Sequence, residues 1–302
     1  MINSMIRLIY LAYMVCLLLC SCNTHSNRVY FTIDPEDRKI VLPVQIDDSI
    51  TARLAFDSGA TIGALVLDST FLLKNPMLFD VDSLVKSGFS GSAWGEYYVP
   101  SSCYKATPDV KVGNKNLVYS RAIVFDWKKY FSTSDSEGMF NIPENDTIHV
   151  WELNFEDNYM EIHSAQNFRL PDDCFEIPMV NVKKYPNPFI IKFPIKVKCN
   201  NGDTLTLDHA FLIDTGMPSD IALIRRDGDE EYNFFNDRKE AVWTSDLSHY
   251  HRYCTVDATL FDKMNIDSLR IYTFDYPNNV IYDYLIGLNF LKRFNVFFDM
   301  KR

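Results

Sequence analysis

The sequence predicts an all-β fold made of two pseudo-symmetric lobes, and three observations support this prediction. The 302 residues include 22 Phe and 17 Tyr, and aromatic side chains pack well on the pleated surface of a sheet. Short alternating segments bounded by turns recur along the chain, whereas helical signals are few. The two halves repeat the same order of segments, which indicates two copies of one architecture.

The composition excludes several classes of protein. A chain with 47% hydrophobic residues can bury a substantial core, so disorder is not expected. The formal net charge is -10 and the Lys and Arg residues do not cluster, so no nucleic-acid partner is expected. The sequence has no glycine-rich phosphate loop, Gly-x-Ser-x-Gly elbow or His-Glu-x-x-His helix. This argues against nucleotide-dependent, serine-hydrolase and metalloprotease functions.

The first 21 residues are typical of a signal peptide. A lone Arg7 precedes the apolar run 8–20, which is short for a membrane span. Residues 19–22 resemble the bacterial lipobox, in which the last cysteine is lipidated, so Cys22 is the expected lipidation site and residues 22–28 a tether. We therefore expect an exported protein, lipid-anchored to a bacterial membrane in the periplasm or at the cell surface. A plain secretory signal and a short anchor helix remain alternatives.

An internal repeat defines the two halves. In each half an alternating strand and a polar turn lead to a hydrophobic strand that ends in an Asp-Ser/Thr-Gly triplet. Glycine in such a triplet permits a tight turn at the end of a strand. The strands and triplets are residues 43–46, 54–56 and 57–59 in the first half, and 194–197, 211–213 and 214–216 in the second.

The repeat continues downstream of the triplets. Segment 122–126 corresponds to segment 271–275, and each is followed at the same offset by a glycine, Gly138 or Gly287. Between the copies, residues 164–178 are polar and lack periodicity, which is typical of a linker. We therefore expect an N-terminal lobe at 29–163 with Asp57 and a C-terminal lobe at 179–302 with Asp214. Short helices are expected only at 80–86 and 285–294, and residues 154–160 are expected to form a hairpin.

The two triplets, together with the C-terminal segment 285–296, resemble the bacterial members of the pepsin/retropepsin aspartic protease family. The resemblance covers roughly residues 29–302 and implies acid-protease-like β-barrel lobes with a cleft between them. In that family a hydrophobic-hydrophobic-Gly element beside each Asp loop completes an interlocked crossing, and residues 285–287 match it. Because both copies lie in one chain, the resemblance implies an aspartic endopeptidase that acts as a monomer on peptide or protein substrates.

The resemblance assigns the catalytic roles to Asp57 and Asp214. Two carboxylates held close together cannot both ionise cheaply, so they share one proton and titrate as a coupled pair. The ionised member can activate a water, and the protonated member can hydrogen-bond to the substrate carbonyl. Neither a cofactor nor a metal is required. The residues expected to support the site are Ser58, Gly59, Thr61, Thr215, Gly216 and Gly287.

The sequence departs from the family pattern at two places. Met217-Pro218 follows the second triplet where the family usually has small or hydroxyl residues, and Ser219 is the nearest hydroxyl that could substitute. Glu137 precedes Gly138 where an apolar residue is expected. These departures keep an alternative open, in which the chain is a catalytically inactive surface lipoprotein that binds peptides or glycans.

A glycine- and aromatic-rich segment, 88–98, occupies the place of the family's flap, a β-hairpin that folds over substrate. The flap candidates are Trp94, Tyr97 and Tyr98. Each of these aromatic residues is equally well explained as an ordinary hairpin side chain. The flap is therefore assigned to the segment and not to one residue.

The remaining polar clusters are weaker candidates. His249 and His251 lie near Cys254, but a polar strand face explains them better than a metal site. The mixed-charge run 225–231 is expected to be a solvated loop. An exported chain permits disulfides, and the sequence leaves all three pairings open among four cysteines, Cys103, Cys174, Cys199 and Cys254.

Overall fold

The computed structural model describes most of the chain after residue 26. The described residues are 27–35, 38–47, 49–60, 63–79, 84–92, 95–105, 107–130, 135–144, 146–181, 189–224, 229–236, 241–244, 250–274 and 284–300. The predicted leader, Cys22 and most of the tether lie outside them. No helix among the described residues is long and apolar enough to cross a membrane.

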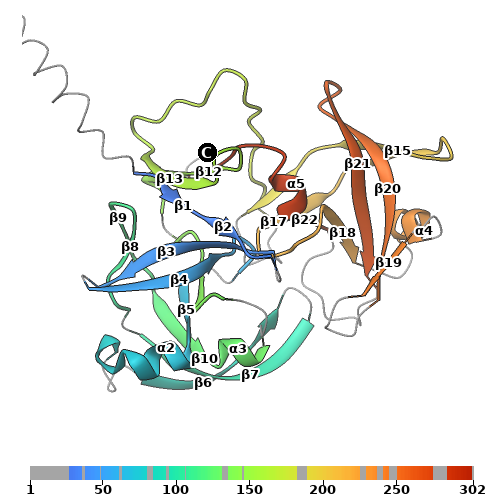
Figure 1. Cartoon of the computed structure of the whole chain (residues 1–302). Helices are drawn as coiled ribbons and strands as arrows, with labels where there is room; N and C mark the ends of the chain where they lie inside the picture. Colours follow the sequence, from blue (N-terminus) through green and yellow to red (C-terminus); the bar gives the residue numbers. More distant parts are fainter. Residues whose placement is uncertain are drawn as a thin grey trace, which may run out of the picture.

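The first half of the chain forms a ten-stranded sheet in the order β6-β7-β10-β5-β11-β4-β3-β8-β9, with β2 paired to β3 (Figure 1). Its strands are β2 (Thr32–Ile33), β3 (Ile40–Ile46), β4 (Ile50–Phe56), β5 (Ala64–Asp68), β6 (Leu84–Ser92), β7 (Gly95–Tyr104), β8 (Val110–Val112), β9 (Lys115–Leu117), β10 (Arg121–Phe125) and β11 (Gly138–Phe140).

The second half forms a nine-stranded sheet in the order β14-β17-β22-β18-β21-β20-β15-β16, with β19 paired to β20. Its strands are β14 (Ile190–Lys192), β15 (Ile195–Cys199), β16 (Thr204–Leu207), β17 (Ala210–Asp214), β18 (Ile221–Ile224), β19 (Ala241–Thr244), β20 (Tyr250–Leu260), β21 (Met264–Phe274) and β22 (Tyr284–Gly287). Figure 1 shows this sheet beside the first. The all-β prediction is confirmed.

A third sheet joins the halves in the order β1-β13-β12-β23. It consists of β1 (Val29–Tyr30), β12 (His149–Asn154), β13 (Tyr159–Ser164) and β23 (Val296–Asp299). The hairpin predicted around residues 154–160 is confirmed, because β12 and β13 pair across it with Asn158 at φ 57°. The last strand of the chain, β23, pairs with β12 and so ties the C-terminus to the first half.

The two large sheets share one topology around their Asp strands. In the first, β11 lies between β4, to which it is parallel, and β5, to which it is antiparallel. In the second, β22 lies between β17 and β18 with the same two orientations. The next strand outward is also parallel in both, β10 beside β5 and β21 beside β18. The predicted repeat is therefore a structural repeat.

A cluster of aromatic side chains packs where the three sheets meet, near β4 and β17, the strands that lead to Asp57 and Asp214. Phe56, which precedes Asp57, stacks on Trp151 of β12 with ring centroids 6.1 Å apart. Phe298 of β23 contacts Phe56 and also Phe189, at 6.4 and 5.2 Å between centroids. All four rings are buried. They draw the three sheets together, which holds the ends of the two Asp strands near one another.

The helices differ from the prediction. They are α2 (Ser69–Lys74), the 3-10 turn η1 (Pro76–Leu78), α3 (Trp127–Tyr130), α4 (Glu230–Asn236) and α5 (Leu288–Leu291). Helix α5 lies within the predicted 285–294, but residues 84–86 belong to strand β6, so that part of the 80–86 prediction is wrong. Residues 80–83 lie outside the described residues.

One further expectation needs correction. Residues 230 and 231 of the expected charged loop begin α4, because Asp229 accepts hydrogen bonds from the backbone N–H groups of Glu231 and Tyr232 and so caps the helix. No disulfide joins Cys103, Cys174, Cys199 and Cys254 in this structure, so it favours none of the three pairings that the sequence leaves open.

Candidate active site

Asp57 and Asp214 lie at the ends of equivalent strands. Asp57 directly follows β4, and Asp214 is the last residue of β17. Each begins a tight turn, in which the N–H of Ala60 or Met217 donates to the aspartate carbonyl at 3.3 or 3.2 Å. The strand therefore presents each carboxyl group at the start of a loop.

Within each triplet, the glycine N–H donates to the carboxylate Oδ1 of its own aspartate. The distance is 2.9 Å both from Gly59 to Asp57 and from Gly216 to Asp214. A carboxylate that accepts a backbone N–H has one oxygen fixed in direction. The two loops therefore hold their carboxylates in the same way.

The two carboxyl groups meet between the loops. A Cβ atom added to Gly59 would lie 2.6 Å from Oδ1 of Asp214, and one added to Gly216 would lie 2.7 Å from Oδ1 of Asp57. Each glycine thus lies against the carboxyl group of the other half, where any side chain would collide. The side chains of Asp57 and Asp214 also hydrogen-bond to each other.

The hydroxyl groups of Ser58 and Thr215 cross-link the loops behind the carboxylates. Ser58 Oγ donates to the carbonyl of Ile213 at 2.8 Å and accepts the N–H of Thr215 at 3.1 Å. Thr215 Oγ1 donates to the carbonyl of Phe56 at 3.1 Å and accepts the N–H of Ser58 at 2.9 Å. Both residues are fully buried. This reciprocal network sets the separation of the two aspartates.

The alignment of the two halves needs correction at β11 and β22, which we call the crossing strands because each lies between the two strands that flank its Asp loop. Strand β22 pairs Gly287 with Asp214, whereas β11 pairs Phe140 with Phe56, so the residue level with Asp57 is Asn141. The counterpart of Gly287 is therefore Asn141 and not Gly138. Glu137 consequently precedes the crossing element and does not occupy its apolar positions, which are filled by Met139 and Phe140.

Glu137 has a structural role of its own. Its carboxylate accepts the backbone N–H of Arg53 at 3.1 Å, and its carbonyl accepts that of Asp68 at 2.8 Å. Gly138 is also required, because its φ is +143° and an added Cβ would lie 2.9 Å from Cα of Leu67. Glu137 and Gly138 thus form the entry to β11 and leave the apolar positions of that strand unchanged.

The loop after Asp214 is fastened by the residues that follow Gly287. The N–H groups of Leu288 and Asn289 donate to the carbonyls of Met217 and Ser219 at 2.7 and 3.0 Å. The side-chain amide of Asn289 donates to the carbonyl of Pro218 at 2.7 Å. Met217 is 3% exposed and packs in an apolar cluster of the second half. Its side chain faces the core rather than the carboxylates.

Ser219 does not replace the hydroxyl that Met217 lacks. Its Oγ is buried and has no hydrogen-bond partner among the described residues. An added Cβ on Gly287 would lie 2.9 Å from that Oγ, which places the hydroxyl beside the crossing strand. In the first loop the corresponding hydrogen bond comes from Asn141, whose side-chain amide donates to the carbonyl of Ala60 at 3.4 Å. Thr61 lies outside the described residues.

Neighbouring charges make the two aspartates chemically unequal. For both, burial raises the pKa of the carboxyl group. For Asp57 the charge of Lys39 and the N–H of Gly59 oppose that effect. For Asp214, which is 5% exposed, the negative charge of Asp57 adds to it and raises the pKa well above the usual range. The two carboxyl groups therefore titrate as one coupled pair in unequal surroundings.

The predicted flap segment forms a hairpin of β6 and β7, in which Ser90 pairs with Tyr98 and Ser92 with Gly95. Tyr97 and Tyr98 lie on β7, and Trp94 lies outside the described residues. Figure 1 shows the hairpin curving along the first half toward the second. The segment therefore has the secondary structure that a flap requires.

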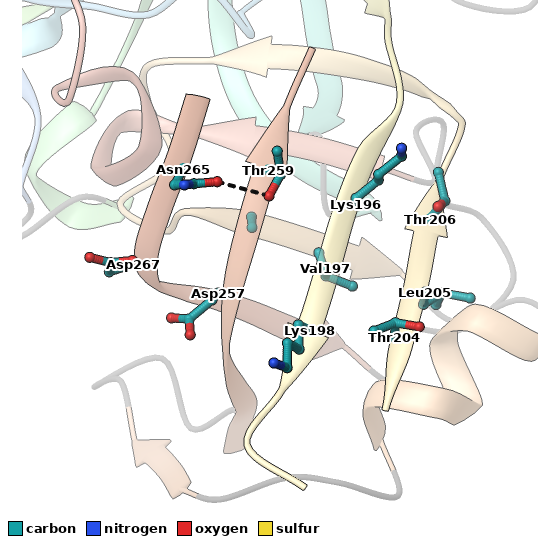
Figure 2. Close-up of a pocket in the computed structure, with 11 residues that line it drawn as sticks. Lys196, Val197, Lys198, Thr204, Leu205, Thr206, Asp257, Thr259, Asn265 and Asp267 are labelled. Atoms are coloured by element: carbon teal, nitrogen blue, oxygen red, sulfur yellow. Dashed lines mark hydrogen bonds between the residues drawn. The ribbon is translucent and has the colours of Figure 1, made fainter. Parts of the chain in front are cut away.

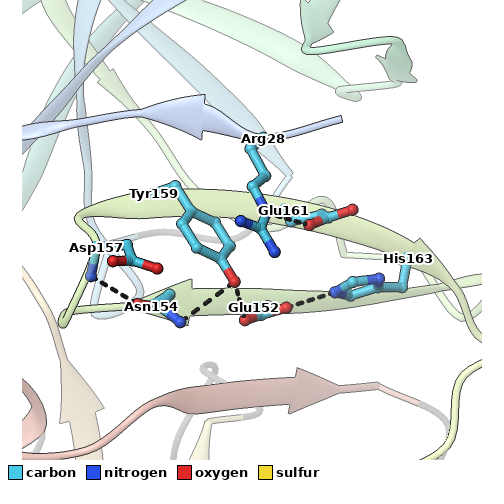
Figure 3. Close-up of polar contacts among 7 residues, drawn as sticks. All are labelled: Arg28, Glu152, Asn154, Asp157, Tyr159, Glu161 and His163. Carbon is cyan, nitrogen blue, oxygen red and sulfur yellow. Dashed lines mark hydrogen bonds and ion pairs between the residues drawn. The ribbon is translucent and has the colours of Figure 1, made fainter. Parts of the chain in front are cut away.

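One group of side chains in the described part of the chain has the spacing of a metal site. Glu152, Glu161 and His163 lie on β12 and β13 (Figure 3). Their carboxylates already have partners, because Arg28 pairs with Glu161 at 3.2 Å, and Tyr159 and His163 bond to Glu152 at 2.8 and 2.7 Å. The arrangement is a partly buried polar network. The His249–His251 candidate falls on residues whose side chains are not described.

An open depression on the second sheet is also separate from the aspartates. It runs across β15, β16, β20 and β21 and is lined by polar side chains that include Lys196, Lys198, Thr204 and Asp257 (Figure 2). None of the residues predicted for the site lines it. It is therefore not the place where the two carboxylates would act.

Comparison with known proteins identifies the fold. No protein-family model matches the sequence, and no curated protein matches it significantly. Among solved structures, the aspartic proteinase from Irpex lacteus is similar, with a TM-score of 0.53, 12% sequence identity and coverage of 91% of this chain and 94% of that chain. Identity at that level bears on fold and not on activity. The chain has the pepsin-like, bilobal all-β fold of an aspartic protease.

Proposed function

We propose that this protein is an aspartic endopeptidase that hydrolyses peptide bonds with a water activated by Asp57 and Asp214. The observation that carries the proposal is the reciprocal contact of the two triplets, in which each glycine lies against the opposite carboxyl group. A purely structural turn has no need to bring two acids together at a site where burial raises the pKa of both. Such perturbed pairs are concentrated at functional sites.

The unequal carboxyl groups suggest separate roles. In the proposed reaction Asp57 is ionised and accepts a proton from a water whose oxygen attacks the peptide carbonyl carbon. Asp214 donates its proton to the carbonyl oxygen, which gives a neutral tetrahedral diol. A proton then passes from Asp57 to the amide nitrogen and the C–N bond breaks. Asp214 regains its proton as the carbonyl re-forms.

The substrate proposed for this site is an extended segment of a peptide or protein. The β6–β7 hairpin is the proposed flap, with Trp94, Tyr97 and Tyr98 as candidate contacts. Because both aspartates come from one chain, a monomer is sufficient. The proposed lobes are residues 29–163 and 179–302, joined by residues 164–178.

The proposed location is the surface of a bacterial membrane. It rests on the signal-like residues 1–21 and on Cys22 within the lipobox-like sequence. Strand β1 begins at Val29, so residues 22–28 are all that would separate the lipid from the folded chain. The anchor is tested by feeding a radioactive or clickable fatty acid to cells that produce the protein. Incorporation of the label into the protein should be abolished in a Cys22→Ser variant.

The activity is tested by incubating the purified protein with a peptide mixture from about pH 3 to pH 7. An Asp57→Asn, Asp214→Asn double variant, shown to be folded, is the control. Cleavage that the control lacks would establish the activity and reveal its specificity. Absence of cleavage at every pH would favour the alternative, a lipoprotein that binds peptides or glycans without turnover.

A further inference from the structure

A buried lysine directly precedes the strand that pairs with the Asp57 strand. Lys39 is 8% exposed, although lysine is seldom buried to this extent. The β3–β4 ladder pairs Ile40 with Phe56, so one further step along the register brings Lys39 opposite Asp57. Residues directly opposite each other in an antiparallel pair project from the same face. The side chains of Lys39 and Asp57 therefore leave the hairpin on the same face.

The backbone around Lys39 is held in place. The carbonyl of Lys39 accepts the N–H of Asp34 at 2.8 Å, and the carbonyl of Asp34 accepts the N–H of Arg38 at 2.9 Å. These bonds close the turn between β2 and β3. The position of Lys39 relative to Asp57 is thus set by a bonded turn on one side and by the strand ladder on the other.

The ammonium group is also positioned, because it lies over an aromatic ring. Lys39 Nζ is 5.2 Å from the ring centroid of Trp127, which is 1% exposed. Trp127 Nε1 donates to Oγ of the fully buried Ser136 at 3.1 Å, which fixes the ring. A cation within about 6 Å of an indole face is attracted to the ring. The charge is therefore held inside the protein rather than in solvent.

We propose that Lys39 is a positioning residue for the aspartate pair, whose buried ammonium group stabilises the singly ionised pair and sets the pH range in which it exists. The proposal concerns ionisation of the pair, and it rests on the proposed function only where cleavage is used to observe it. Lys39 touches neither water nor peptide in this role.

The charge of Lys39 acts on both carboxyl groups. Burial raises the pKa of Asp57 and of Asp214, and Lys39 opposes this effect in each. Removing the ammonium should therefore raise both pKa values. Both protons of the pair would then be lost at higher pH. The pH range in which the pair is singly ionised would therefore move upward.

The other charged groups near Lys39 and the two loops have partners of their own. Asp34, buried in the same turn, accepts the N–H of Asp135 at 3.3 Å, and Arg38 is exposed. Asp68 caps α2 by accepting the N–H of Thr70 at 2.8 Å. Asp220, beyond the second loop, accepts the N–H of Arg270 at 3.0 Å. These three carboxylates are thus each held by a backbone N–H outside the aspartate pair.

The test compares three variants of the purified full chain. Lys39→Met removes the charge and keeps the length of the side chain, and Lys39→Arg keeps the charge. Lys198→Met removes one charge from an exposed position on β15 and controls for net charge. Asp57 and Asp214 are titrated by NMR with ¹³C-labelled aspartate, and the pH profile of kcat/KM is measured on a cleaved peptide.

In Lys39→Met both titration steps, and both limbs of the cleavage profile, should move upward by roughly one pH unit or more, the size typical of losing a nearby opposite charge. Lys39→Arg and Lys198→Met should titrate like the unaltered protein. A Lys39→Met protein that titrates like the unaltered one would overturn the inference.

The two readouts separate this inference from the proposed function. An NMR shift without cleavage by any form of the protein would support Lys39 and reject the peptidase. Cleavage whose pH profile is unchanged in Lys39→Met would support the peptidase and reject the role of Lys39.

Discussion

The loop after Asp57 and the loop after Asp214 have the same backbone framework but different surroundings. In both, the glycine N–H holds the carboxylate Oδ1 at 2.9 Å. The first loop is fastened by the amide of Asn141 at 3.4 Å, whereas the second is bonded through three carbonyls, those of Met217, Pro218 and Ser219. The second aspartate is also the more deeply buried.

This difference teaches that symmetry of the backbone does not impose symmetry of charge. Lys39 and Asp57 adjoin the same end of the β3–β4 hairpin, while the negative charge of Asp57 raises the pKa of Asp214. In the proposed mechanism the less exposed second loop supplies the acid and the first loop supplies the base. A base and an acid arise from two copies of one motif.

The largest effect should come from removing either carboxyl group. Asp57→Asn and Asp214→Asn should each lower kcat/KM by about 100-fold to 10,000-fold, because a positioned acid or base contributes about that factor. Peptide cleavage at the optimal pH measures it. Asp208→Asn, which alters an exposed acid 3.6 Å from Lys192, should retain full activity. A single Asn variant with nearly normal cleavage would show that the pair does not act together.

The crossing strands should respond unequally to substitution. Gly287→Ala places a Cβ 2.7 Å from the carbonyl oxygen of Met217, so backbone must move, and we expect a loss of about 3 kcal/mol or more in unfolding free energy. Asn141→Gly removes the 3.4 Å hydrogen bond to the carbonyl of Ala60 and should cost only about 1–2 kcal/mol. Urea unfolding measures both. Equal losses would mean that the two loops are fastened equally.

The reciprocal hydroxyl network should respond equally. Ser58→Ala and Thr215→Val each remove two buried hydrogen bonds and leave their partners unsatisfied, so each should cost about 2–4 kcal/mol of unfolding free energy. Thr215→Ser keeps the hydroxyl and should recover most of that loss in the same urea experiment. Losses of unfolding free energy that differ greatly between Ser58→Ala and Thr215→Val would show that the two hydroxyl groups do not contribute equally.

The aspartates should differ in their effect on stability with pH. A folded-state pKa that is raised favours folding below the unfolded pKa of about 4, and this contribution is lost as the pH rises. At pH 7 both Asn variants should therefore be more stable than the unaltered protein, and Asp214→Asn should gain more because its pKa is raised further. The gain should fade toward pH 4 in urea unfolding. A larger gain for Asp57→Asn would reverse the proton assignment.

The smallest effect should come from Ser219. Because its buried Oγ has no partner among the described residues, Ser219→Ala removes a desolvated hydroxyl without breaking a bond. We expect an unfolding free energy within about 1 kcal/mol of the unaltered protein, on the stabilising side. A loss as large as that of Ser58→Ala would mean that the hydroxyl supports the second loop after all.

The strands and triplets could be predicted because their signals are local. Alternation of side chains and a glycine turn placed Asp57 and Asp214 at strand ends, and the β12–β13 hairpin followed from the same pattern. Helix α4 also had a local signal, since Asp229 is a common capping residue, but the surrounding charges suggested a loop.

The equivalence of Gly287 with Asn141 could not be predicted from spacing. Gly138 and Gly287 stand at equal offsets in the sequence, but the first half inserts three more residues before the chain reaches the level of its aspartate. Offsets count residues and do not reveal where a loop ends. Only the pairing of β11 with β4 shows which residue lies beside Asp57.

By itself the sequence determined that the chain contains two strand-ending acids in a repeated, β-rich framework, because alternation and turn formation depend on near neighbours. The tertiary structure decided that these acids meet, that Ser58 and Thr215 bind across 157 residues of chain, and that Lys39 and Asp57 adjoin the same end of the β3–β4 hairpin. Burial and the fields of distant charges exist only once the sheets have packed, since separation along the chain says nothing about separation in space.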